Sequence, residues 1–526
     1  MWQKGKAMRK IHTTLLSAIG MVIILGSLTA CGGGGSASPA ATNGGAGNSG
    51  AGNTGGGNTG TGNSGTGNGG NTSTTTTLSP AAQLGQLLFV DKNLSSGKNM
   101  SCETCHDPAY AYGPPNSLAV QLGSDGVSWG LRATPSLRYK SMTPAYSDNA
   151  ENPDGITANA PGGGFFWDGR AKTLADQAGG PMLNPLEMNN ASQADVVQKV
   201  SQSAYANQFK QVYGQNVFAD VATAFSDIED AIQAYETEDP SFHPFSSKFD
   251  LALNNKVGGD LTPAELRGLG IFNSGSTGNC NACHYEGANF TDSAGNASQA
   301  LMTDFTYQAV GAPRNDASIP NNPSPIPANA DSTYIDMGLC GPGNDGAYDS
   351  HTPGSSTSGA GPDPYTGVNN PDPYCGRFKV PTLRNIATRT AFFHNGVFHS
   401  LQQVLQFYNT RDTHPEYWYP ASGGTGTAVN NPSYALQPTY VPGATVNKFN
   451  DLPAIYQGNI DEELPMGQGQ TDAGGTTLLN GALPRPAGSA PIFSDQDIQD
   501  LICFMNTLSD GYQPPATPPT SGTCVN

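Results

Sequence analysis

The chain carries the pattern Cys-x-x-Cys-His twice, at residues 102–106 and 280–284. This spacing is typical of covalent c-type haem attachment, in which two thiols form thioethers with one haem and the adjacent histidine binds its iron. A redox-active cysteine pair or half of a zinc site would also use two such cysteines, but neither explains a histidine after both pairs. The sequence therefore predicts two c-type haems. The predicted attachment residues and iron ligands are Cys102, Cys105, His106, Cys280, Cys283 and His284.

Residues 1–30 are predicted to be a lipoprotein-type signal peptide. Basic residues precede an apolar run at residues 15–28, which leads into Leu-Thr-Ala-Cys at residues 28–31. The run is shorter than the roughly 20 residues of a membrane-spanning helix, and the cysteine stands where acylation occurs in bacterial lipoproteins. We therefore expect an exported protein of the periplasm, outer membrane or cell surface, with a lipid anchor to the membrane on Cys31. A plain secretory signal and an uncleaved anchor are the alternatives.

Residues 31–77 consist almost entirely of Gly, Asn, Ser, Thr and Ala. Such a composition cannot bury enough apolar surface to offset the entropy of ordering the chain, so this segment is predicted to be a flexible tether. The formal charge of −18 argues against a nucleic-acid partner. It would suit a basic protein partner, although a solvated acidic surface is the commoner explanation.

Four cysteines are left after the lipid and haem assignments. Of the nine cysteines, one is assigned to lipid and four to haem, and the remaining ones are Cys340, Cys375, Cys503 and Cys524. Four remaining cysteines in an exported chain predict two disulfides. The sequence allows three pairings, of which we favour the nearest neighbours, 340 with 375 and 503 with 524.

A sequence repeat relates the two haem motifs. Each motif is preceded by a Leu-Ser-Pro-Ala or Leu-Thr-Pro-Ala segment, and its Ser or Thr followed by Pro predicts a capped helix start. Two more segments recur after each motif. The matching pairs are residues 78–85 with 261–268, 131–138 with 378–384, and 165–170 with 392–397. The repeat predicts two homologous haem domains.

The N-terminal haem domain is predicted at residues 78–250 and the C-terminal one at 251–512, with a tail at 513–526. Apolar residues recur at helical spacing in both, and strand signals are sparse. Residues 288–374 lack this periodicity and are predicted to be an inserted, ordered loop or cover. The predicted fold is all-α: two homologous cytochrome c-type haem domains with long irregular loops.

Three further motifs accompany the haem motifs: Phe-Trp-Asp-Gly-Arg at 166–170, Pro-Met-Leu-Asn-Pro-Leu-Glu-Met at 181–188, and Phe-Lys-Val-Pro-Thr-Leu-Arg-Asn at 378–385. Together with Gln177 they make nearly all of residues 78–512 resemble the bacterial di-haem cytochrome c peroxidases and their relative MauG.

The resemblance implies roles for three side chains. Trp167 would lie between the haems, Gln177 and Glu187 would face the open side of the first haem, and the second haem would relay electrons. A carboxylate there suits the chemistry, because peroxide must lose a proton from one oxygen and gain one on the other before its O–O bond breaks. Gln177 can hydrogen-bond bound peroxide. Without the resemblance, Glu187 would be a surface acid and Trp167 a core aromatic.

Pro181 and Tyr408 occupy equivalent positions in the repeat, each 14 residues after Trp167 or His394. The resemblance makes Tyr408 the expected sixth ligand of the second haem, since classical members carry a methionine there and MauG a tyrosine. A core tyrosine on the same helical face as Leu401, Val404 and Leu405 is the alternative.

Two more departures from the classical pattern concern the first haem and calcium. No histidine occurs between His106 and Trp167, so the first iron is expected to be permanently open. Ala133 stands where the family usually supplies an asparagine to a calcium ion between the haems, so calcium binding is doubtful.

The sequence thus predicts a di-haem peroxidase that reduces hydrogen peroxide at the N-terminal haem. Electrons would reach it through the C-terminal haem from a small cytochrome c or cupredoxin. One alternative is a MauG-like oxidase that modifies Trp or Tyr of a partner protein. The other is a non-enzymatic electron-transfer module, which would not react with peroxide.

Overall fold

A computed structural model of the chain describes residues 77–153, 160–287, 290–292, 295–296, 298–340, 361–362, 369–370, 374–462, 465–466, 485–515 and 524. The predicted signal peptide, Cys31 and nearly all of the predicted tether lie outside these residues, as do parts of the predicted insertion. The described residues belong to one compact unit, Thr74–Asn526. The division into two domains near residue 250 stays a prediction.

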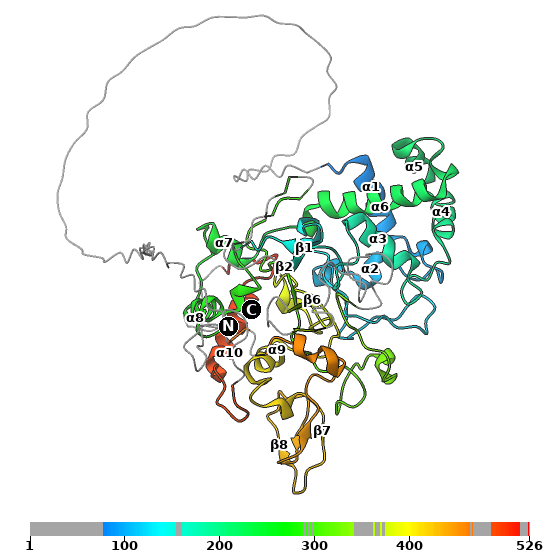
Figure 1. Ribbon diagram of the computed structural model, residues 1–526. Coiled ribbons are helices and arrows are strands. Elements are labelled where there is room, and N and C mark those ends of the chain that lie inside the picture. Colours follow the sequence, from blue (N-terminus) through cyan, green and yellow to red (C-terminus); the bar gives the residue numbers. More distant parts are fainter. Residues whose placement is uncertain are drawn as a thin grey trace, which may run out of the picture. The chain divides into compact units, whose positions relative to one another are not determined.

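The described chain is helix-rich (Figure 1). Its α-helices are α1 (Pro80–Val90), α2 (Cys102–Cys105), α3 (Leu174–Leu183), α4 (Gln193–Ser201), α5 (Ala206–Tyr213), α6 (Val221–Glu238), α7 (Lys248–Leu253), α8 (Pro263–Asn273), α9 (Leu401–Thr410) and α10 (Asp495–Asn506). Short 3-10 turns join them, among them η3 (Lys140–Met142) and η6 (Cys280–Ala282).

Short strands add antiparallel two-stranded ladders that the all-α prediction did not include. They pair β1 (Ser147–Ala150) with β2 (Ala160–Gly162), β3 (Tyr307–Gln308) with β6 (Phe378–Lys379), β4 (Gly361–Pro362) with β5 (Asn369–Asn370), β7 (Ala421–Ser422) with β10 (Thr445–Val446), and β8 (Val429–Asn430) with β9 (Thr439–Tyr440). Strands this short fall below the length at which an alternating pattern can be recognised in a sequence.

Helix α1 opens the first haem-motif segment and packs against α6. The hydroxyl of Ser79 caps its N-terminus by accepting from the amide of Ala82, and Pro80 takes the first helical position, as predicted. Gly85 lies where the two helices cross, and a Cβ atom there would overlap the carbonyl oxygen of Ala231. The crossing therefore requires a glycine at this position.

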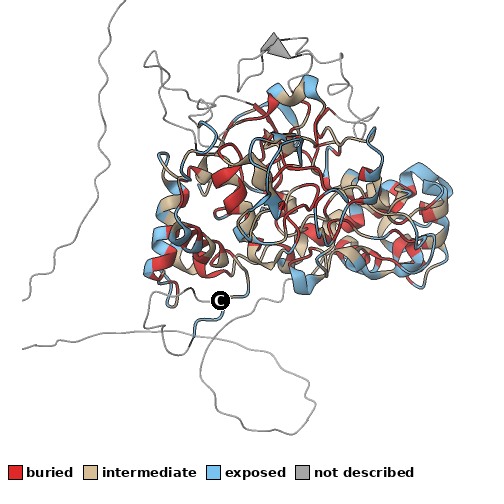
Figure 2. Cartoon of the chain, turned by 90° about the horizontal axis from the view of Figure 1, so that it is seen from below, coloured by how far each residue is buried: buried red, intermediate tan, exposed pale blue. Residues whose placement is uncertain are grey.

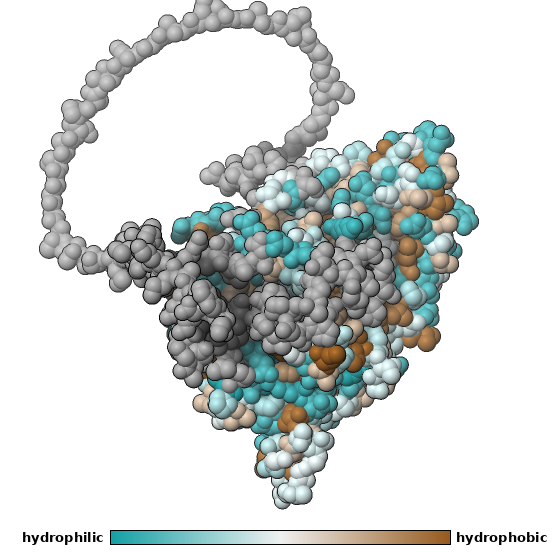
Figure 3. Space-filling model, viewed as in Figure 1, coloured by the Kyte–Doolittle hydropathy of each residue, from teal (hydrophilic) through white to brown (hydrophobic). Residues whose placement is uncertain are grey.

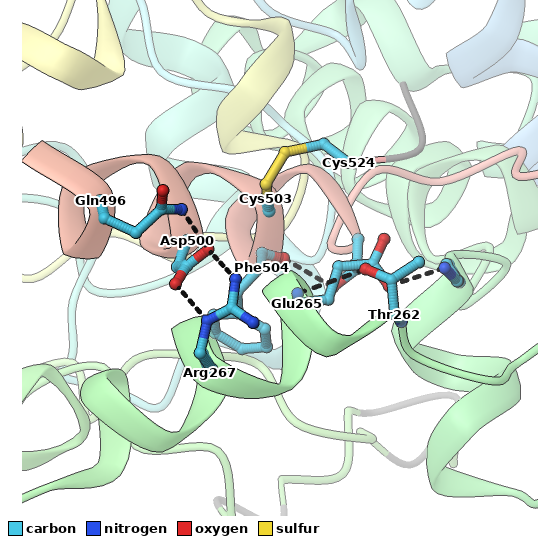
Figure 4. The surroundings of a disulfide bond; sticks show 10 residues. Thr262, Glu265, Arg267, Gln496, Asp500, Cys503, Phe504 and Cys524 are labelled. Atoms are coloured by element: carbon cyan, nitrogen blue, oxygen red, sulfur yellow. Dashed lines mark hydrogen bonds and ion pairs between the residues drawn. A yellow bond between two sulfur atoms is a disulfide. The ribbon is translucent and has the colours of Figure 1, made fainter. Parts of the chain in front are cut away.

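Helix α8 opens the second segment and packs against α10 in the same way (Figure 4). Thr262 caps this helix start as predicted, and it forms a capping box with Glu265. At the crossing, a Cβ atom on Gly268 would overlap the carbonyl oxygen of Asp500. Next to it, Arg267 binds the Asp500 carboxylate through Nε and Nη2, at 2.6 and 2.9 Å. Gly85 and Gly268 are equivalent in the sequence repeat, so the two haem-motif segments are held by matching helix crossings.

Two backbone hydrogen bonds join the two repeats reciprocally. The amide of Ala133 donates to the carbonyl of His394 at 2.7 Å, and the amide of Lys379 donates to the carbonyl of Trp167 at 2.8 Å. Ala133 matches Lys379 in the repeat, and Trp167 matches His394. Each repeat therefore donates one backbone hydrogen bond to the other and accepts the equivalent bond in return.

Buried residues run through the middle of the folded part, and exposed ones lie on the outer faces of the helices (Figure 2). One apolar core forms around α1, α3, α4 and α6 and a larger one around α8, α9 and α10. Their fully buried members include Leu84, Leu88, Phe209, Ile228, Phe272, Phe407, Trp418 and Phe504. The face in Figure 3 is mostly hydrophilic, with hydrophobic residues in separate spots.

Both predicted disulfide pairings are confirmed, Cys340 with Cys375 and Cys503 with Cys524. The second joins α10 to residue 524 (Figure 4). Within the predicted insertion, the guanidinium of Arg314 donates to the carbonyls of Asn329, Asp331 and Tyr334 at 2.8 to 3.1 Å. The described segment at residues 314–334 of the insertion is therefore held around this side chain. Of the helices in the described ranges, none combines the length and the hydropathy that crossing a membrane requires.

The glycine at the α8–α10 crossing gives a stability test with a control in the same helix. Gly268→Ala should lower the free energy of unfolding by about 1–3 kcal/mol, because its methyl group overlaps backbone that must shift. Gly270→Ala should leave stability unchanged or raise it by about 0.5–1 kcal/mol, since a Cβ atom there meets no atom within 4 Å. Guanidinium unfolding followed by circular dichroism measures both; equal effects would contradict the close crossing.

Candidate haem sites

A first cavity of about 530 Å³ lies beside the first haem motif. Cys102 and Cys105 of α2 and the following His106 line it, and so do Gln177 and Pro181 of α3. Its volume is within the roughly 300–1,000 Å³ of cofactor sites. Glu187, which follows α3, also lines it, so the structure brings the predicted attachment residues and the predicted distal residues into one cavity.

A second cavity of about 150 Å³ is lined by Cys280, Cys283 and His284. Tyr408 of α9 lines it too. Most of its other lining residues are apolar, among them Phe272, Leu401, Val404, Leu405 and Met505. This cavity is smaller than usual for a cofactor. The two thiols and the imidazole that line it are the same donor set as in the first cavity.

That donor set suits a c-type haem in both cavities. The four cysteines are free thiols, while the other four described cysteines form disulfides. His106 and His284 direct Nδ1 to a backbone carbonyl, that of Tyr112 at 3.0 Å and that of Met302 at 3.1 Å. Burial lowers the pKa of both imidazoles to about 4. A neutral imidazole whose Nδ1–H is held by a carbonyl has its Nε2 lone pair available to a metal.

Trp167 lines both cavities. Its indole Nε1 donates to the carbonyl of Ala133 at 2.8 Å, and its own carbonyl accepts from Lys379. The side chain is therefore held at the junction of the two repeats.

Glu187 is the acidic group among the predicted site residues. Asn184 Nδ2 donates to its Oε1 at 2.8 Å. Burial raises the pKa of Glu187, while the charge of Arg170 and the bond from Asn184 act in the opposite direction. A raised pKa suits a carboxyl that takes up and returns a proton near neutral pH. Gln177 lies half-buried in the same lining.

Pro181 of α3 lines the first cavity, and Tyr408 lines the second from the equivalent position of α9. Both helices have ten residues, and each of these residues is the eighth. Pro181 has no group that can bind iron, and His106 is the one histidine among the described residues lining the first cavity. Burial raises the pKa of the Tyr408 phenol, an effect that charge from the nearby cysteines reinforces and that Arg411 opposes.

Sequence reasoning missed an ion-pair network on the wall of the first cavity. Arg132 Nη1 contacts Asp168 Oδ2 at 2.5 Å, and Arg132 Nε contacts Asp336 Oδ2 at 2.6 Å. Arg132, Asp336 and Tyr334 line the cavity. Arg132 and Asp168 belong to repeated motifs and could have been singled out. Tyr334 and Asp336 come from the predicted insertion, whose place in space no sequence pattern indicated.

No cluster of His, Cys, Asp and Glu side chains suited to a metal ion is found in the part of the chain that the structure describes. The doubt about calcium, based on Ala133, stays a prediction.

Comparison with known proteins identifies relatives that cover much of the folded part. A family model described as di-haem cytochrome c peroxidase matches residues 79–258. The methylamine utilization protein MauG of Paracoccus denitrificans is 36% identical over 333 residues, which cover 62% of this chain and 74% of that protein. The cytochrome c551 peroxidase of Nitrosomonas europaea is 28% identical over 329 residues, covering 62% of this chain and 71% of that protein.

Solved structures give the same result. The diheme peroxidase BthA of Burkholderia thailandensis superposes with a TM-score of 0.62 at 31% identity, covering 84% of this chain and 88% of that one. A variant of the same peroxidase with one tyrosine replaced by methionine superposes with the same TM-score at 32% identity, covering 82% of this chain and 86% of that one.

Proposed function

Because this chain belongs to the family of di-haem cytochrome c peroxidases and MauG, we propose that it reduces hydrogen peroxide at its first haem with electrons relayed through its second. The observation that carries this proposal is the distribution of side chains around the two cavities. Glu187 and Gln177 line the first cavity and not the second, whereas Trp167 lines both. One cavity is equipped for proton transfer to peroxide, and an oxidisable ring connects it to the other.

The residues that would hold the two haems are the cysteine pairs and the histidines of the two motifs. When bound, the haem in the first cavity supplies the iron at which peroxide accepts electrons. Glu187 would take the proton from one oxygen of peroxide and return it to the other, which leaves as water. Gln177 orients peroxide by hydrogen bonding. Two electrons and two protons convert each peroxide to two waters.

Trp167 would carry electrons between the cavities. Its ring is fixed by the Ala133 carbonyl, so it needs no rearrangement to do so. The electron donor would be a small cytochrome c or cupredoxin. The two disulfides are typical of a chain exported to an oxidising compartment, in which such donors occur. Lipid on Cys31 would tether the enzyme to a membrane there.

Replacing Glu187 tests the proton-transfer step. Glu187→Gln should slow peroxide cleavage by ~10²-fold or more, the scale of general acid–base assistance, while both haems stay attached. Stopped-flow spectroscopy of the oxidised protein measures the rate. Glu151→Gln removes an exposed carboxylate and is the matched control. Unchanged rates would remove Glu187 from the mechanism, and no peroxide reaction in the wild type would indicate an electron-transfer module.

Replacing Trp167 tests the connection between the cavities. Trp167→Phe keeps an aromatic ring but is much harder to oxidise, so oxidation of the second haem by peroxide should slow. The matched control is Trp129→Phe, since Trp129 packs against another cluster and lines neither cavity. Oxidation of the second haem at the wild-type rate in Trp167→Phe would place the relay elsewhere.

Tyr408 is the observation that favours a second candidate, a MauG-like oxidase of Trp or Tyr in a partner protein. As an anionic ligand, Tyr408 would lower the potential of the second haem relative to a methionine ligand, which disfavours electron uptake from a high-potential donor. Turnover with peroxide and a reduced small cytochrome c separates the two functions. Rapid turnover supports the peroxidase, whereas reaction with peroxide but no turnover supports the oxidase.

The ligand itself can be tested by spectroscopy. Tyr408→His should change the electron paramagnetic resonance spectrum of the second haem and raise its potential, because a neutral ligand stabilises the ferric state less than a phenolate. Tyr434→His is the control, since Tyr434 packs on Trp418 and does not line the second cavity. An unchanged spectrum in Tyr408→His would mean that Tyr408 is a core residue.

A further inference from the structure

A third cavity, of about 40 Å³, lies between the two haem cavities. It shares Pro135, Leu137, Phe166 and Gln177 with the first cavity, Lys379 and Pro381 with the second, and Trp167 with both. The space suffices for a small group of about one or two waters in volume. It adjoins the ring that the proposed electron path uses.

Two lysines line this third cavity together, Lys140 from η3 and Lys379 from β6. Lys379 is 5% exposed, and its ammonium donates to the carbonyl of Gly164. No acidic residue of the described chain lines the cavity, and neither lysine forms an ion pair with any carboxylate of the described residues. Two lysine side chains therefore share this space without a counter-ion from the described chain.

The acids that act on these lysines either pair with arginines or form no ion pair with a described residue. Asp168 is held by Arg132 and Arg170, at 2.5 and 2.9 Å. Glu236 is buried and makes no ion pair in the described part of the chain, and it influences Lys140 only through its charge. Burial, together with the charge of Arg389, lowers the pKa of Lys140 to about 8. Burial and the charge of Lys140 likewise lower the pKa of Lys379.

A third cation adds to this positive region. Arg389 donates to the carbonyls of Thr134 and Ala391, at 3.1 and 3.2 Å, and forms no ion pair with a described carboxylate. Thr134 lines the first cavity. An unpaired buried charge costs several kcal/mol, so a region with several of them is suited to an anion that arrives from outside the chain.

We propose that Lys140 and Lys379 form a carboxylate site in the third cavity, and that the carboxylate is a propionate of the haem in the first cavity. A haem carries its two propionates on the edge opposite its vinyl groups. The third cavity shares five lining residues with the first cavity and three with the second, which favours the first haem. It excludes Cys102 and Cys105, as the propionate edge requires. A carboxylate at this site pairs with both lysines and places its negative charge beside Trp167.

The experiment measures the midpoint potentials of both haems in the holo-protein by spectroelectrochemistry. Lys140→Met and Lys379→Met should each lower the potential of the first haem, because an unneutralised propionate stabilises the ferric state. We expect at least a tenfold change in its ferric-to-ferrous ratio, which is about 59 mV for one electron. Lys140→Arg and Lys379→Arg keep the charge and should stay near the wild-type potential. Lys92→Met, at an exposed position, is the control.

Thioethers attach the haems independently of the propionates, so the haem content of every variant should be two per chain. Potentials of both Met variants equal to the wild type would overturn the carboxylate site, since neutral lysines would then occupy the cavity. Wild-type potentials that change with formate concentration would overturn the haem as the source, because the site would exchange its anion with the solvent. If a Met variant fails to fold, the same formate titration of wild type and the Arg variants decides between these results.

Discussion

Two reciprocal backbone hydrogen bonds fix how the two repeats lie against each other, and the rest of the site depends on this arrangement. They join Ala133 to His394 and Lys379 to Trp167. They join equivalent segments of the two repeats, so each haem motif is placed relative to the other by main-chain geometry. The side chain of Trp167 follows from this placement, because its indole is bonded to the same Ala133. A shift of either segment would separate Trp167 from one of the cavities.

On this symmetric frame the two cavities differ at equivalent positions. Helices α3 and α9 present Pro181 to the first cavity and Tyr408 to the second. Trp167 reaches both cavities, while its counterpart His394 lines only the second of the two and stacks on Phe378 at a centroid distance of 3.5 Å. The family membership supports a peroxidase or a MauG-like oxidase. The two cavities therefore differ in single side chains at equivalent positions and not in fold.

Charged side chains gather around the cavities. Arg132 bridges Asp168 and Asp336 with short ion pairs, whereas Lys140, Lys379 and Arg389 have no acidic partner in the described chain. The paired cation attaches the insertion to the first cavity. Lys140 and Lys379 line the third cavity, the space that a carboxylate of the cofactor would enter under our proposal.

The sequence by itself determined the features that depend on neighbours in the chain. The haem motifs, the helix caps at Ser79 and Thr262, and the nearest-neighbour disulfides could all be predicted, because spacing and local hydrogen bonding define them. The repeat also marked Gly85 and Gly268 as equivalent. The repeat could not explain why these positions require glycine, since the carbonyls that a Cβ atom would overlap belong to helices far along the chain.

Only the tertiary structure decided which residues meet between the cavities. Arg132 and Asp336 are 204 residues apart, and Lys140 and Lys379 come from different repeats. Neither pair has a local pattern, because contacts between distant segments depend on how the helices cross and how the strands pair. The resemblance alone predicts that Trp167 lies between the haems. That its side chain lines both cavities, held by a hydrogen bond to one segment and a backbone contact with another, is visible only in three dimensions.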